Sequence, residues 1–579
     1  MDTVNVKING KEYSVPAGST VLEAAKIANI DIPTLCYLKD INEIGACRLC
    51  LVEVKGARGL VTACVYPVNE GMEITTNSPK IRAARKTNLE LLLSNHDRRC
   101  LSCVKSTTCE LQKLCQEYGV EEGHFTGVKS EYPLDESSVA IIRDNNKCIL
   151  CRRCTAACTQ LQGIGAIGAN DRGFDTHIAS PFEMPLAETT CINCGQCVVA
   201  CPTGALYERD DTKQVFDAIA DPTKHVAICA APSVRATIGE CFGYEPGTDV
   251  EGKMVAAMKA LGFDGVYDMN LTADLTIMEE ATEFLDRFQN GGKLPLITSC
   301  SPGWIKYCEH YFPEMTENLS SCKSPQQMFG AMYKTYYAQK VGLDPKDIFF
   351  VSVIPCTAKK FEVKRDGQNA AGVPDVDVAI TTRELARMIE TAGINFRDLA
   401  DEKFDQPFDI GSGAGAIFGA TGGVMEAALR TAAEVITGQT LEKLDFEEVR
   451  GTAGIKRASY KLGDVEIKVA VCSGTANANR LLKAVEAGEE KVDFIEIMAC
   501  PGGCVNGGGQ PVQPAVVRNN VNLREKRAAV LYNADKNLLN IRKSHENSAV
   551  KKLYDEFLEH PGSHKAHEIL HTHYVKRGL

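Results

Sequence analysis

The chain has 579 residues, of which 44% are hydrophobic and 24% charged, and this length exceeds what one hydrophobic core normally supports. We therefore expect several domains. The formal net charge of −11 disfavours nucleic acid as a partner, because no basic stripe offsets the repulsion from phosphates. No run of about 18 apolar residues occurs, so the sequence predicts no membrane span.

Cysteine is the unusual component of the sequence, with 25 residues. The count is odd, many of the cysteines stand in CxxC spacing, and the chain begins Met-Asp-Thr-Val-Asn-Val-Lys rather than with an apolar stretch. These features argue against a secreted disulfide framework and favour reduced, metal-binding thiols. We therefore expect the protein to work in a reducing cytoplasm.

In residues 1–79, polar and apolar side chains alternate over residues 3–8, and Asn9-Gly10 follows. This combination predicts a β-hairpin. A helix is expected over residues 21–28. Four cysteines follow, a CxxC pair flanked by two distant partners: Cys36, Cys47, Cys50 and Cys64. The spacing suits a cluster wrapped by one loop, although a zinc site or unpaired core thiols would leave the same residues. Together these features resemble a plant-type ferredoxin with one 2Fe–2S cluster, in the longer-loop variety of complex I relatives.

Residues 80–125 carry the pattern HxxxCxxCxxxxxC, formed by His96, Cys100, Cys103 and Cys109. Imidazole and thiolate ligands suit zinc as well as iron. The position between two ferredoxin-like modules favours a 4Fe–4S cluster. The pattern resembles the His-ligated site of the complex I large iron–sulfur subunit and of certain hydrogenases.

Residues 126–215 carry the bacterial run CxxCxxCxxxC twice, the second time followed by Pro202. In such pairs the fourth cysteine of each run ligates the other cluster. The spacing therefore predicts two 4Fe–4S clusters, one held by Cys148, Cys151, Cys154 and Cys201 and the other by Cys158, Cys191, Cys194 and Cys197. With the two preceding modules they would form an electron-transfer chain, which needs a reaction centre at its end.

Residues 216–515 contain three stretches that differ from ordinary buried thiols. They are Thr298-Ser299-Cys300-Ser301-Pro302-Gly303-Trp304, the stretch from Ile354 through Cys356 to Glu362, and the stretch from Glu496 through Cys500 and Cys504 to Pro511. They closely resemble the three signature motifs of the iron-only hydrogenases, TSCCPxW, PCxxKxxE and ExMACxxGCxxGGGxP. The second and third motifs match in full. The likeness covers nearly the whole chain, as far as His571.

The resemblance implies a multidomain α/β and α+β protein: a β-grasp ferredoxin domain, a small His-Cys₃ domain, a two-cluster ferredoxin domain and a two-lobed α/β catalytic domain. Between the lobes it implies an H-cluster, a 4Fe–4S cube joined to a diiron unit with CO, CN⁻ and dithiolate ligands. By motif position Cys356, Cys500 and Cys504 would hold the cube, with Cys504 bridging.

The diiron pocket implied by the resemblance consists of Ala231, Pro232, Ser233, Ser324, Gln326, Ile354, Lys359, Phe418 and Met498. The Lys359 ammonium and backbone N–H groups near Ser233 can donate hydrogen bonds to CN⁻. The remaining wall should be apolar and dry, so that CO ligands pack and water is kept out.

The first motif departs from the family pattern, because Ser301 stands where the family has its second cysteine. In the family the first cysteine relays protons and the second ligates the cube. Three alternatives remain: Ser301 ligates, Cys300 ligates in its place, or three cysteines alone bind the cube. Multi-subunit members of the family tend to carry this form, so we do not interpret it as loss of activity.

A helix predicted over residues 272–287 places Glu280, Glu283 and Arg287 on one stripe. A solvated face with an i,i+4 ion pair would also explain the stripe. The family's proton path runs from the relay cysteine through a glutamate, a serine and a second glutamate. By position these are Cys300, Glu280, Ser320 and Glu283, and we predict that they carry protons to the metal site.

Two further features are interpreted as structural. The glycine-rich run 411–423 lacks a βαβ frame with an acidic residue about 20 positions on, so we expect it to pack around the H-cluster rather than bind a dinucleotide. Residues 516–579 are expected to form a helical segment like a small hydrogenase subunit. Its histidines are expected at the surface: His560, His564, His567, His571 and His573.

The sequence thus predicts reversible conversion of protons and electrons to H₂. Expected partners are ferredoxin, flavin- and NADH-binding iron–sulfur subunits that couple both donors by electron bifurcation, and maturation proteins for the diiron unit. No flavin or NAD site is evident in the sequence. A non-catalytic electron-transfer or iron–sulfur assembly protein is the alternative, and the pocket residues Lys359 and Met498 argue against it.

Overall fold

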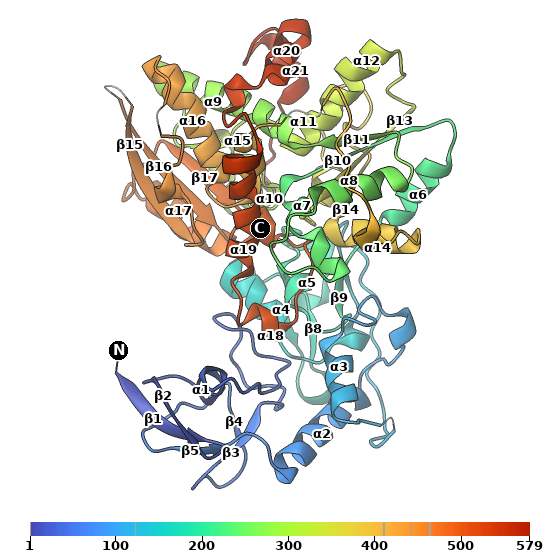
Figure 1. Ribbon diagram of the computed structural model, residues 1–579, viewed down its shortest axis with the longest axis vertical. Helices are drawn as coiled ribbons and strands as arrows, with labels where there is room; N and C mark the ends of the chain where they lie inside the picture. Colours follow the sequence, from blue (N-terminus) through green and yellow to red (C-terminus); the bar gives the residue numbers. More distant parts are fainter. Residues whose placement is uncertain (1, 122, 409–410, 442, 463–464, 579) are drawn as a thin grey trace.

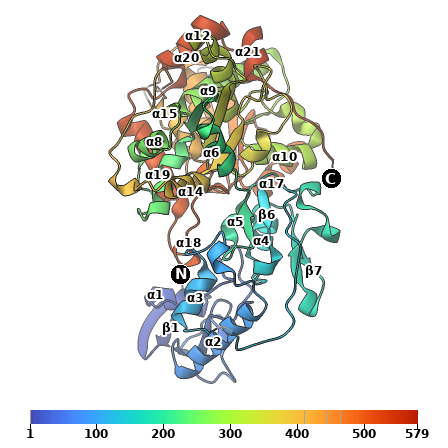
Figure 2. The ribbon, with the colours of Figure 1, turned by 90° about the vertical axis from the view of Figure 1, so that its right-hand side faces the viewer.

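The computed structural model describes residues 2–121, 123–408, 411–441, 443–462 and 465–578. The chain forms a mixed α/β multidomain protein in which the N-terminal iron–sulfur modules, blue to cyan in Figure 1, lie below a larger C-terminal part. The side view separates the same two parts (Figure 2). Among the described residues, no helix combines the length and the hydropathy that crossing a bilayer requires.

The first module is a five-stranded sheet in the order β2-β1-β5-β3-β4 with one short helix. The predicted hairpin is confirmed, because β1 (Thr3–Ile8) pairs antiparallel with β2 (Lys11–Pro16) through Asn9 and Gly10, both at positive φ. Helix α1 (Val21–Ile27) begins at a capping box formed by Thr20 and Glu23. The other strands are β3 (Leu51–Val54), β4 (Val61–Thr62) and β5 (Glu73–Thr75).

The second and third modules pack directly on each other. Helices α2 (Pro79–Ser94) and α3 (Glu110–Glu117) flank the His96 pattern, and the Glu110 carboxylate forms an ion pair with buried Arg153 at 2.9 Å. The third module consists of two short antiparallel pairs and two short helices: β6 (Ile141–Arg143) with β9 (Leu206–Glu208), β7 (Gly168–Asn170) with β8 (His177–Ala179), α4 (Arg153–Ala156) and α5 (Gln196–Ala200).

The C-terminal part is built on two four-stranded sheets. The first is wholly parallel, in the order β11-β10-β13-β14: β10 (His225–Ala230), β11 (Gly265–Asp268), β13 (Ile348–Ile354) and β14 (Val378–Thr381). The second has the order β12-β17-β16-β15, with β15 antiparallel: β12 (Leu296–Ile297), β15 (Ile455–Leu462), β16 (Val465–Ser473) and β17 (Phe494–Met498). The carboxyl ends of β13 and β17 both open onto one cavity, the usual place for a ligand in parallel sheets.

Helices cover both sheets, and the long helix α9 (Asn270–Asn290) confirms the helix predicted over residues 272–287. The others are α6 (Thr212–Ala220), α7 (Pro232–Arg235), α8 (Glu251–Ala260), α10 (Pro302–Tyr311), α11 (Pro325–Met332), α12 (Ala338–Val341), α13 (Lys359–Glu362), α14 (Thr382–Thr391), α15 (Gly413–Ala416), α16 (Gly423–Thr437) and α17 (Thr475–Glu486).

The C-terminal segment is helical, with α18 (Ala515–Arg518), α19 (Leu523–Asn533), α20 (Ser548–Leu553) and α21 (His564–Leu570). Figure 1 shows α18 at the junction of the two parts. There the Arg518 guanidinium donates to the Val199 carbonyl at 2.7 Å, and the Lys39 N–H donates to the Asn519 side chain at 3.0 Å. These bonds join the C-terminal segment to the first and third modules.

The glycine-rich run packs tightly, but most of it lies against helices rather than around the cavity. A Cβ on Gly415 would lie 2.4 Å from the Asn270 carbonyl oxygen. Gly419 and its neighbour Phe418 are the part of the run that lines the cavity, and a Cβ on Gly419 would lie 3.0 Å from the Ser233 Cβ. Close approach of α15 to α9 therefore accounts for much of the run.

The expectation that all C-terminal histidines lie at the surface was wrong for His571. Its side chain is only 6% exposed, whereas His560, His564, His567 and His573 are exposed. Hydrogen bonds from His571 to Glu279 and Ser321 compensate for the burial of its ring.

Candidate active site and iron–sulfur sites

Four thiols of the first module converge beneath its long loop. The Cys50 and Cys64 sulfurs lie 3.3 Å apart, and the Cys47 N–H donates to the Cys36 sulfur at 3.5 Å. All four are buried, free thiols. Backbone N–H groups aimed at sulfur favour the thiolate form, the form that binds iron. The donor set therefore fits an iron–sulfur cluster.

In the second module His96 is buried, and burial lowers the pKa of its imidazole to about 4. A neutral imidazole is the form that ligates a metal. Its Nδ1 atom has no hydrogen-bond partner among the described residues, which leaves it available. Gly204 of the third module lies so close that a Cβ there would be 2.6 Å from the Cys103 sulfur. The second and third sites are thus immediate neighbours.

The third module contains two small cavities, each lined by four thiols. The thiols gather in the grouping that the spacing predicts, Cys148, Cys151, Cys154 and Cys201 around one cavity and Cys158, Cys191, Cys194 and Cys197 around the other. Burial raises the pKa of most of these thiols, so that they need cationic partners to ionise. Iron would supply that charge.

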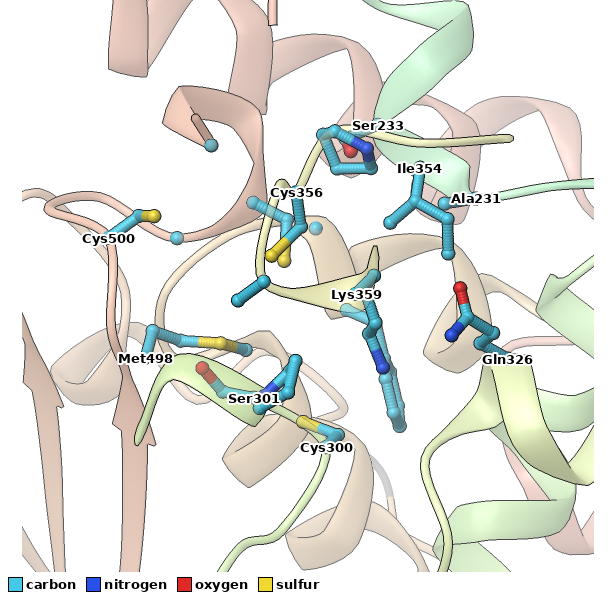
Figure 3. Close-up of a pocket in the computed structure, with 18 of the residues that line it drawn as sticks. Ala231, Ser233, Cys300, Ser301, Gln326, Ile354, Cys356, Lys359, Met498 and Cys500 are labelled. Atoms are coloured by element: carbon cyan, nitrogen blue, oxygen red, sulfur yellow. The ribbon is translucent and has the colours of Figure 1, made fainter. Parts of the chain in front are cut away.

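A larger cavity lies between the two sheets of the C-terminal part. Predicted residues reach its wall from the ends of β10, β13 and β17 and the loops after them, from the segment before α10, from the starts of α11 and α13, and from the turn after α15. They are Ala231, Pro232, Ser233, Cys300, Ser301, Gln326, Ile354, Cys356, Lys359, Phe418, Met498, Cys500 and Cys504. Figure 3 draws residues of this wall around one space and labels ten of them. Ser324 does not line the cavity. It is buried behind the wall, where its hydroxyl donates to Glu362 at 2.8 Å.

Three thiols from distant segments share this cavity: Cys356 after β13, and Cys500 and Cys504 after β17. Burial raises the pKa of each, that of Cys504 to about 12, and nearby thiolates of the set raise the pKa of Cys500 further. Three such thiols can ionise close together only when a metal offsets the charge of the thiolates. Glycines let the backbone fold closely around them, since a Cβ on Gly507 would lie 2.2 Å from the Pro355 oxygen.

The first motif contributes Cys300 and Ser301 to the same wall, next to Met498 (Figure 3). The Ser301 hydroxyl oxygen accepts a hydrogen bond from the Ala499 N–H at 3.2 Å. Burial, and then the charge of Glu280, raise the pKa of Cys300 well above its ordinary value. Cys300 is therefore a thiol that holds its proton at neutral pH.

Lys359 points into the cavity from the start of α13 and is held by a carboxylate behind the wall. Its ammonium donates to both oxygens of Glu362, at 2.9 and 3.0 Å. Glu362 also accepts from Gln326 at 2.9 Å. Glu362 was not predicted as a site residue. The second motif ends with Glu362, three residues after Lys359, and this position is the sequence signal that could have identified it as a site residue.

Ser233 places a buried hydroxyl group in the wall of the cavity. Its side chain is fully buried, and its hydroxyl has no hydrogen-bond partner among the described residues. Buried polar groups are normally paired, so an unpaired hydroxyl facing a cavity indicates a ligand that it contacts when the site is filled. The thiols, the ammonium and this hydroxyl fit a cluster with anionic ligands.

Glu280 lies between the cavity and the outer residues of the predicted proton path. It is 1% exposed, and neither carboxylate oxygen has a hydrogen-bond partner in the described part of the chain. Burial, and then the charge of Glu283, raise its pKa to about 8, against smaller opposing effects of Ser320 and the Ser299 N–H. Glu280 is therefore protonated at neutral pH and can pass a proton on.

The outer end of the path is formed by Ser320, Glu283 and Arg287. The Ser320 hydroxyl donates to Glu283 at 2.9 Å, and the Arg287 guanidinium forms the expected ion pair with Glu283 at 2.5 Å. The structure thus contains the ion pair of the simpler interpretation and a hydrogen bond between Ser320 and Glu283. Glu280 lies close enough to Cys300 and Glu283 to interact electrostatically with both.

Family models match five parts of the chain. The "iron only hydrogenase large subunit, C-terminal domain" matches residues 224–508 and the "iron hydrogenase small subunit" residues 521–577. The "2Fe-2S iron-sulfur cluster binding domain" matches residues 1–79, the "NADH-ubiquinone oxidoreductase-G iron-sulfur binding region" residues 85–124, and the "4Fe-4S dicluster domain" residues 147–205.

Full-length relatives and a solved structure agree with these models. The "NADP-reducing hydrogenase subunit HndD" of Solidesulfovibrio fructosivorans is 50% identical, and the match covers 100% of both chains. "Iron hydrogenase 1" of Clostridium pasteurianum is 45% identical over 98% of this chain and 99% of its own length. A variant of the FeFe-hydrogenase HydA1 from Chlamydomonas reinhardtii superposes with a TM-score of 0.57, at 42% identity over 64% of this chain and 100% of that chain.

Iron–sulfur assembly factors match more distantly, at 28 to 30% identity. The full-length relatives are hydrogenases, and the large and small hydrogenase models both match. The chain therefore belongs to the iron-only hydrogenases, enzymes that act on H₂, as a member with N-terminal iron–sulfur domains.

Proposed function

We propose that the cavity between the two sheets holds an H-cluster, with Cys356, Cys500 and Cys504 as ligands of its 4Fe–4S cube. The observation that carries this proposal is the convergence of three thiols, one ammonium and one unpaired hydroxyl on a single apolar wall. When bound, this group would supply the iron centre and the bridging amine at which protons and electrons are exchanged with H₂. The residues around it position it, exclude water and deliver protons.

Infrared spectroscopy and H₂ turnover of anaerobically matured protein test this proposal. We expect carbonyl and cyanide bands together with turnover in the unchanged chain. Cys504→Ser should lose both, whereas Cys308→Ser should keep them, because Cys308 is a buried thiol in α10 that does not line the cavity. Bands that persist in Cys504→Ser would contradict the proposed bridge.

For the protons, we propose a path from Glu283 through Ser320 and Glu280 to Cys300. Glu280 and Cys300 are supported as carriers because burial keeps both protonated at neutral pH. Lys359 is proposed to donate hydrogen bonds to a cyanide ligand while Glu362 holds its ammonium in place. Ser324 acts in this scheme through Glu362, because its hydroxyl does not face the cavity.

For the electrons, we propose one 2Fe–2S cluster and three accessory 4Fe–4S clusters. Direct electron transfer to the cube is supported by Cys194. This residue lines both the small cavity of the second cysteine group (Cys158, Cys191, Cys194 and Cys197) and the large cavity. The Cys500 sulfur lies 4.0 Å from the Cys194 carbonyl oxygen. The innermost accessory cluster would thus adjoin the cube. Iron and sulfide analysis with EPR counting of reduced clusters checks this number.

We further propose that the chain works in a reducing cytoplasm, as one subunit of a complex that links H₂ to NAD(P)H and ferredoxin by electron bifurcation. The "NADP-reducing" name of the 50% identical relative supports the nucleotide link. Flavin and nucleotide sites would then belong to partner subunits. Affinity purification from the native host tests this: co-purified flavin with NAD(P)-dependent turnover is expected, and a chain that purifies alone and ignores nucleotides would contradict it.

A further inference from the structure

The segment after α21 runs beside the loop that carries Ser320. The Tyr574 hydroxyl donates to the Ser320 carbonyl oxygen at 2.6 Å, and the Thr572 N–H donates to the Ser321 carbonyl oxygen at 2.8 Å. An isolated β-bridge joins Cys322 and His571. Residues more than 200 positions apart are thus held side by side at the outer end of the proposed proton path.

His571 lies between two acidic residues of α9. Its Nε2 is 3.0 Å from a Glu279 oxygen, and its Nδ1 is 2.8 Å from the Ser321 hydroxyl oxygen. The Ser321 N–H in turn donates to Glu283 at 3.0 Å. A ring nitrogen of His571, the Cys322 sulfur and a Glu283 oxygen lie within 4.8 Å of one another. One water molecule or one hydroxyl spans such a gap.

The His571 ring reaches the surface through a second histidine. The ring centroids of His567 and His571 are 3.9 Å apart, and His567 is exposed. The charged and titratable groups around His571 are Glu279 and Glu283 of α9, Cys322 of the adjoining loop and His567 of α21. The Tyr554 hydroxyl, directly after α20, donates a hydrogen bond to Glu279 at 2.5 Å.

The chemistry of this cluster favours histidine as the entry point for protons. Arg287 is the ion-pair partner of Glu283, but a guanidinium does not release its proton. An imidazole takes up and releases protons near neutral pH. The buried Glu279 carboxylate beside Nε2 stabilises the charged ring.

We propose that His571 relays protons between solvent and Glu283, with Glu279 holding its ring, an inference that rests on the proton path proposed above. A water or a hydronium ion from solvent gives a proton to Nε2, the ring nitrogen that faces away from Ser321, and becomes hydroxide or water. The imidazolium then releases its Nδ1 proton through the Ser321 hydroxyl, or through one water, to a Glu283 oxygen. Rotation of the neutral ring restores the starting tautomer, and only N–H and O–H bonds change.

The rate at which Glu280 exchanges its proton for deuterium tests this relay without depending on turnover. Glu280 is protonated below about pH 8, so its carboxylic acid band in the infrared shifts when solvent D₂O reaches it. The measurement uses the full chain with its accessory clusters, both with and without the diiron unit. In His571→Gln we expect exchange and H₂ turnover to slow by about tenfold or more. Added imidazole should restore both in His571→Gly.

His573→Asn is the matched control, because His573 is an exposed histidine two positions further along. It should leave both rates unchanged. Tyr574→Phe removes the bond to Ser320 but leaves His571 in place, so a merely structural effect of this segment would appear there without rescue by imidazole. Equal exchange rates in His571→Gln and the unchanged chain would overturn the inference.

If His571→Gln does not fold, Glu279→Gln keeps the test decisive. Glu279→Gln removes the carboxylate that holds the His571 ring, so deuterium exchange at Glu280 should slow as it does in His571→Gln. An unchanged exchange rate in Glu279→Gln would also overturn the relay. A chain that exchanges normally but makes no H₂ would refute the proposed function alone, whereas turnover with unaltered exchange in the His571 variants would refute the relay alone.

Discussion

The Lys359 ammonium lies 2.9 and 3.0 Å from the two carboxylate oxygens of Glu362, and both side chains are nearly buried. The next residue, Lys360, is also buried and pairs with Glu384 at 2.8 Å and with Asp211 at 2.5 Å, but it does not line the cavity. Two neighbouring lysines of one short helix are therefore both buried beside carboxylates and differ in their access to the site. This pair makes a matched comparison possible.

We expect Lys359→Met and Lys360→Met both to destabilise the chain but to differ in function. Each leaves at least one buried carboxylate without its cation, which costs about 3–5 kcal/mol in the free energy of unfolding. Thermal unfolding should show a loss for Lys360→Met at least as large as that for Lys359→Met, because Lys360 pairs with both Glu384 and Asp211. Cyanide bands and H₂ turnover should disappear in Lys359→Met and remain in folded Lys360→Met. Equal loss of the bands in both would contradict a ligand contact by Lys359.

Ser233→Ala should not destabilise the protein before the diiron unit is inserted. Its buried hydroxyl has no partner in the described structure, so its removal should leave the free energy of unfolding unchanged or raise it by about 1 kcal/mol. Ser412→Ala is the control, because that buried hydroxyl is bonded to Asp274 at 2.5 Å and its loss should cost about 1–3 kcal/mol.

After maturation the same Ser233→Ala change should alter the cyanide bands of the loaded protein. The reason is that a hydrogen-bond donor near one ligand is lost. The predicted combination is thus a neutral effect on the empty chain and a spectral shift in the loaded one. A large loss of stability with unchanged bands would show that the hydroxyl serves only packing.

Glu280 makes the stability of the fold depend on pH. Its contribution falls as pH rises, whereas the contribution of a salt-bridged carboxylate rises with pH. Its pKa is about 8 when folded and near 4.5 when unfolded, so between these values the folded chain holds a proton that the unfolded chain has lost. Its contribution to stability is therefore greatest below pH 4.5 and is lost as pH rises toward 8.

Glu280→Gln does not titrate, so its stability relative to the unchanged chain should increase from pH 5 to pH 8. Thermal midpoints across this range measure the difference. Glu568→Gln, a change at an exposed position, should show no such trend. A constant difference between Glu280→Gln and the unchanged chain would mean that Glu280 is ionised in the fold, and it could not then be the inner proton carrier.

Gly195 lies where the innermost accessory site meets the large cavity. Its φ is +69°, and a Cβ would lie 2.5 Å from the Thr357 hydroxyl oxygen and 2.9 Å from the Gly508 Cα. Gly173 has a similar φ of +62° with no atom within 4 Å of such a Cβ. Alanine at either position carries about the same backbone strain, of order 1–2 kcal/mol. Only Gly195→Ala, however, forces the innermost accessory site away from the large cavity.

Gly195→Ala should therefore slow H₂ evolution driven by reduced ferredoxin, and Gly173→Ala should not. Cluster reduction followed by rapid-freeze EPR locates the slow step between the innermost accessory cluster and the cube. If both variants evolve H₂ at the same rate, the contact of Gly195 with Thr357 and Gly508 does not set the electron route.

Local patterns predicted what depends on local geometry. The two cysteine runs prescribe their crossed grouping, because short turns around a cluster leave few ways to arrange four thiols at that spacing. The hairpin at Asn9-Gly10 and the helix carrying Glu280 and Glu283 followed from turn chemistry and helical periodicity.

Features that depend on contacts between distant segments could not be read from such patterns. His571 is buried because a segment nearly 300 positions after Glu279 folds back onto α9. Ser324 turns away from the cavity because Glu362 accepts its hydroxyl hydrogen. The glycine run serves mainly the close contact of α15 with α9, a partner that its own composition does not reveal.

Iron-edge anomalous scattering from crystals of the matured chain would locate the metal most directly. Iron peaks should lie among the sulfurs of Cys356, Cys500 and Cys504, in addition to peaks at the accessory thiol groups. Filled accessory sites with an iron-free cavity between β13 and β17 would contradict the account.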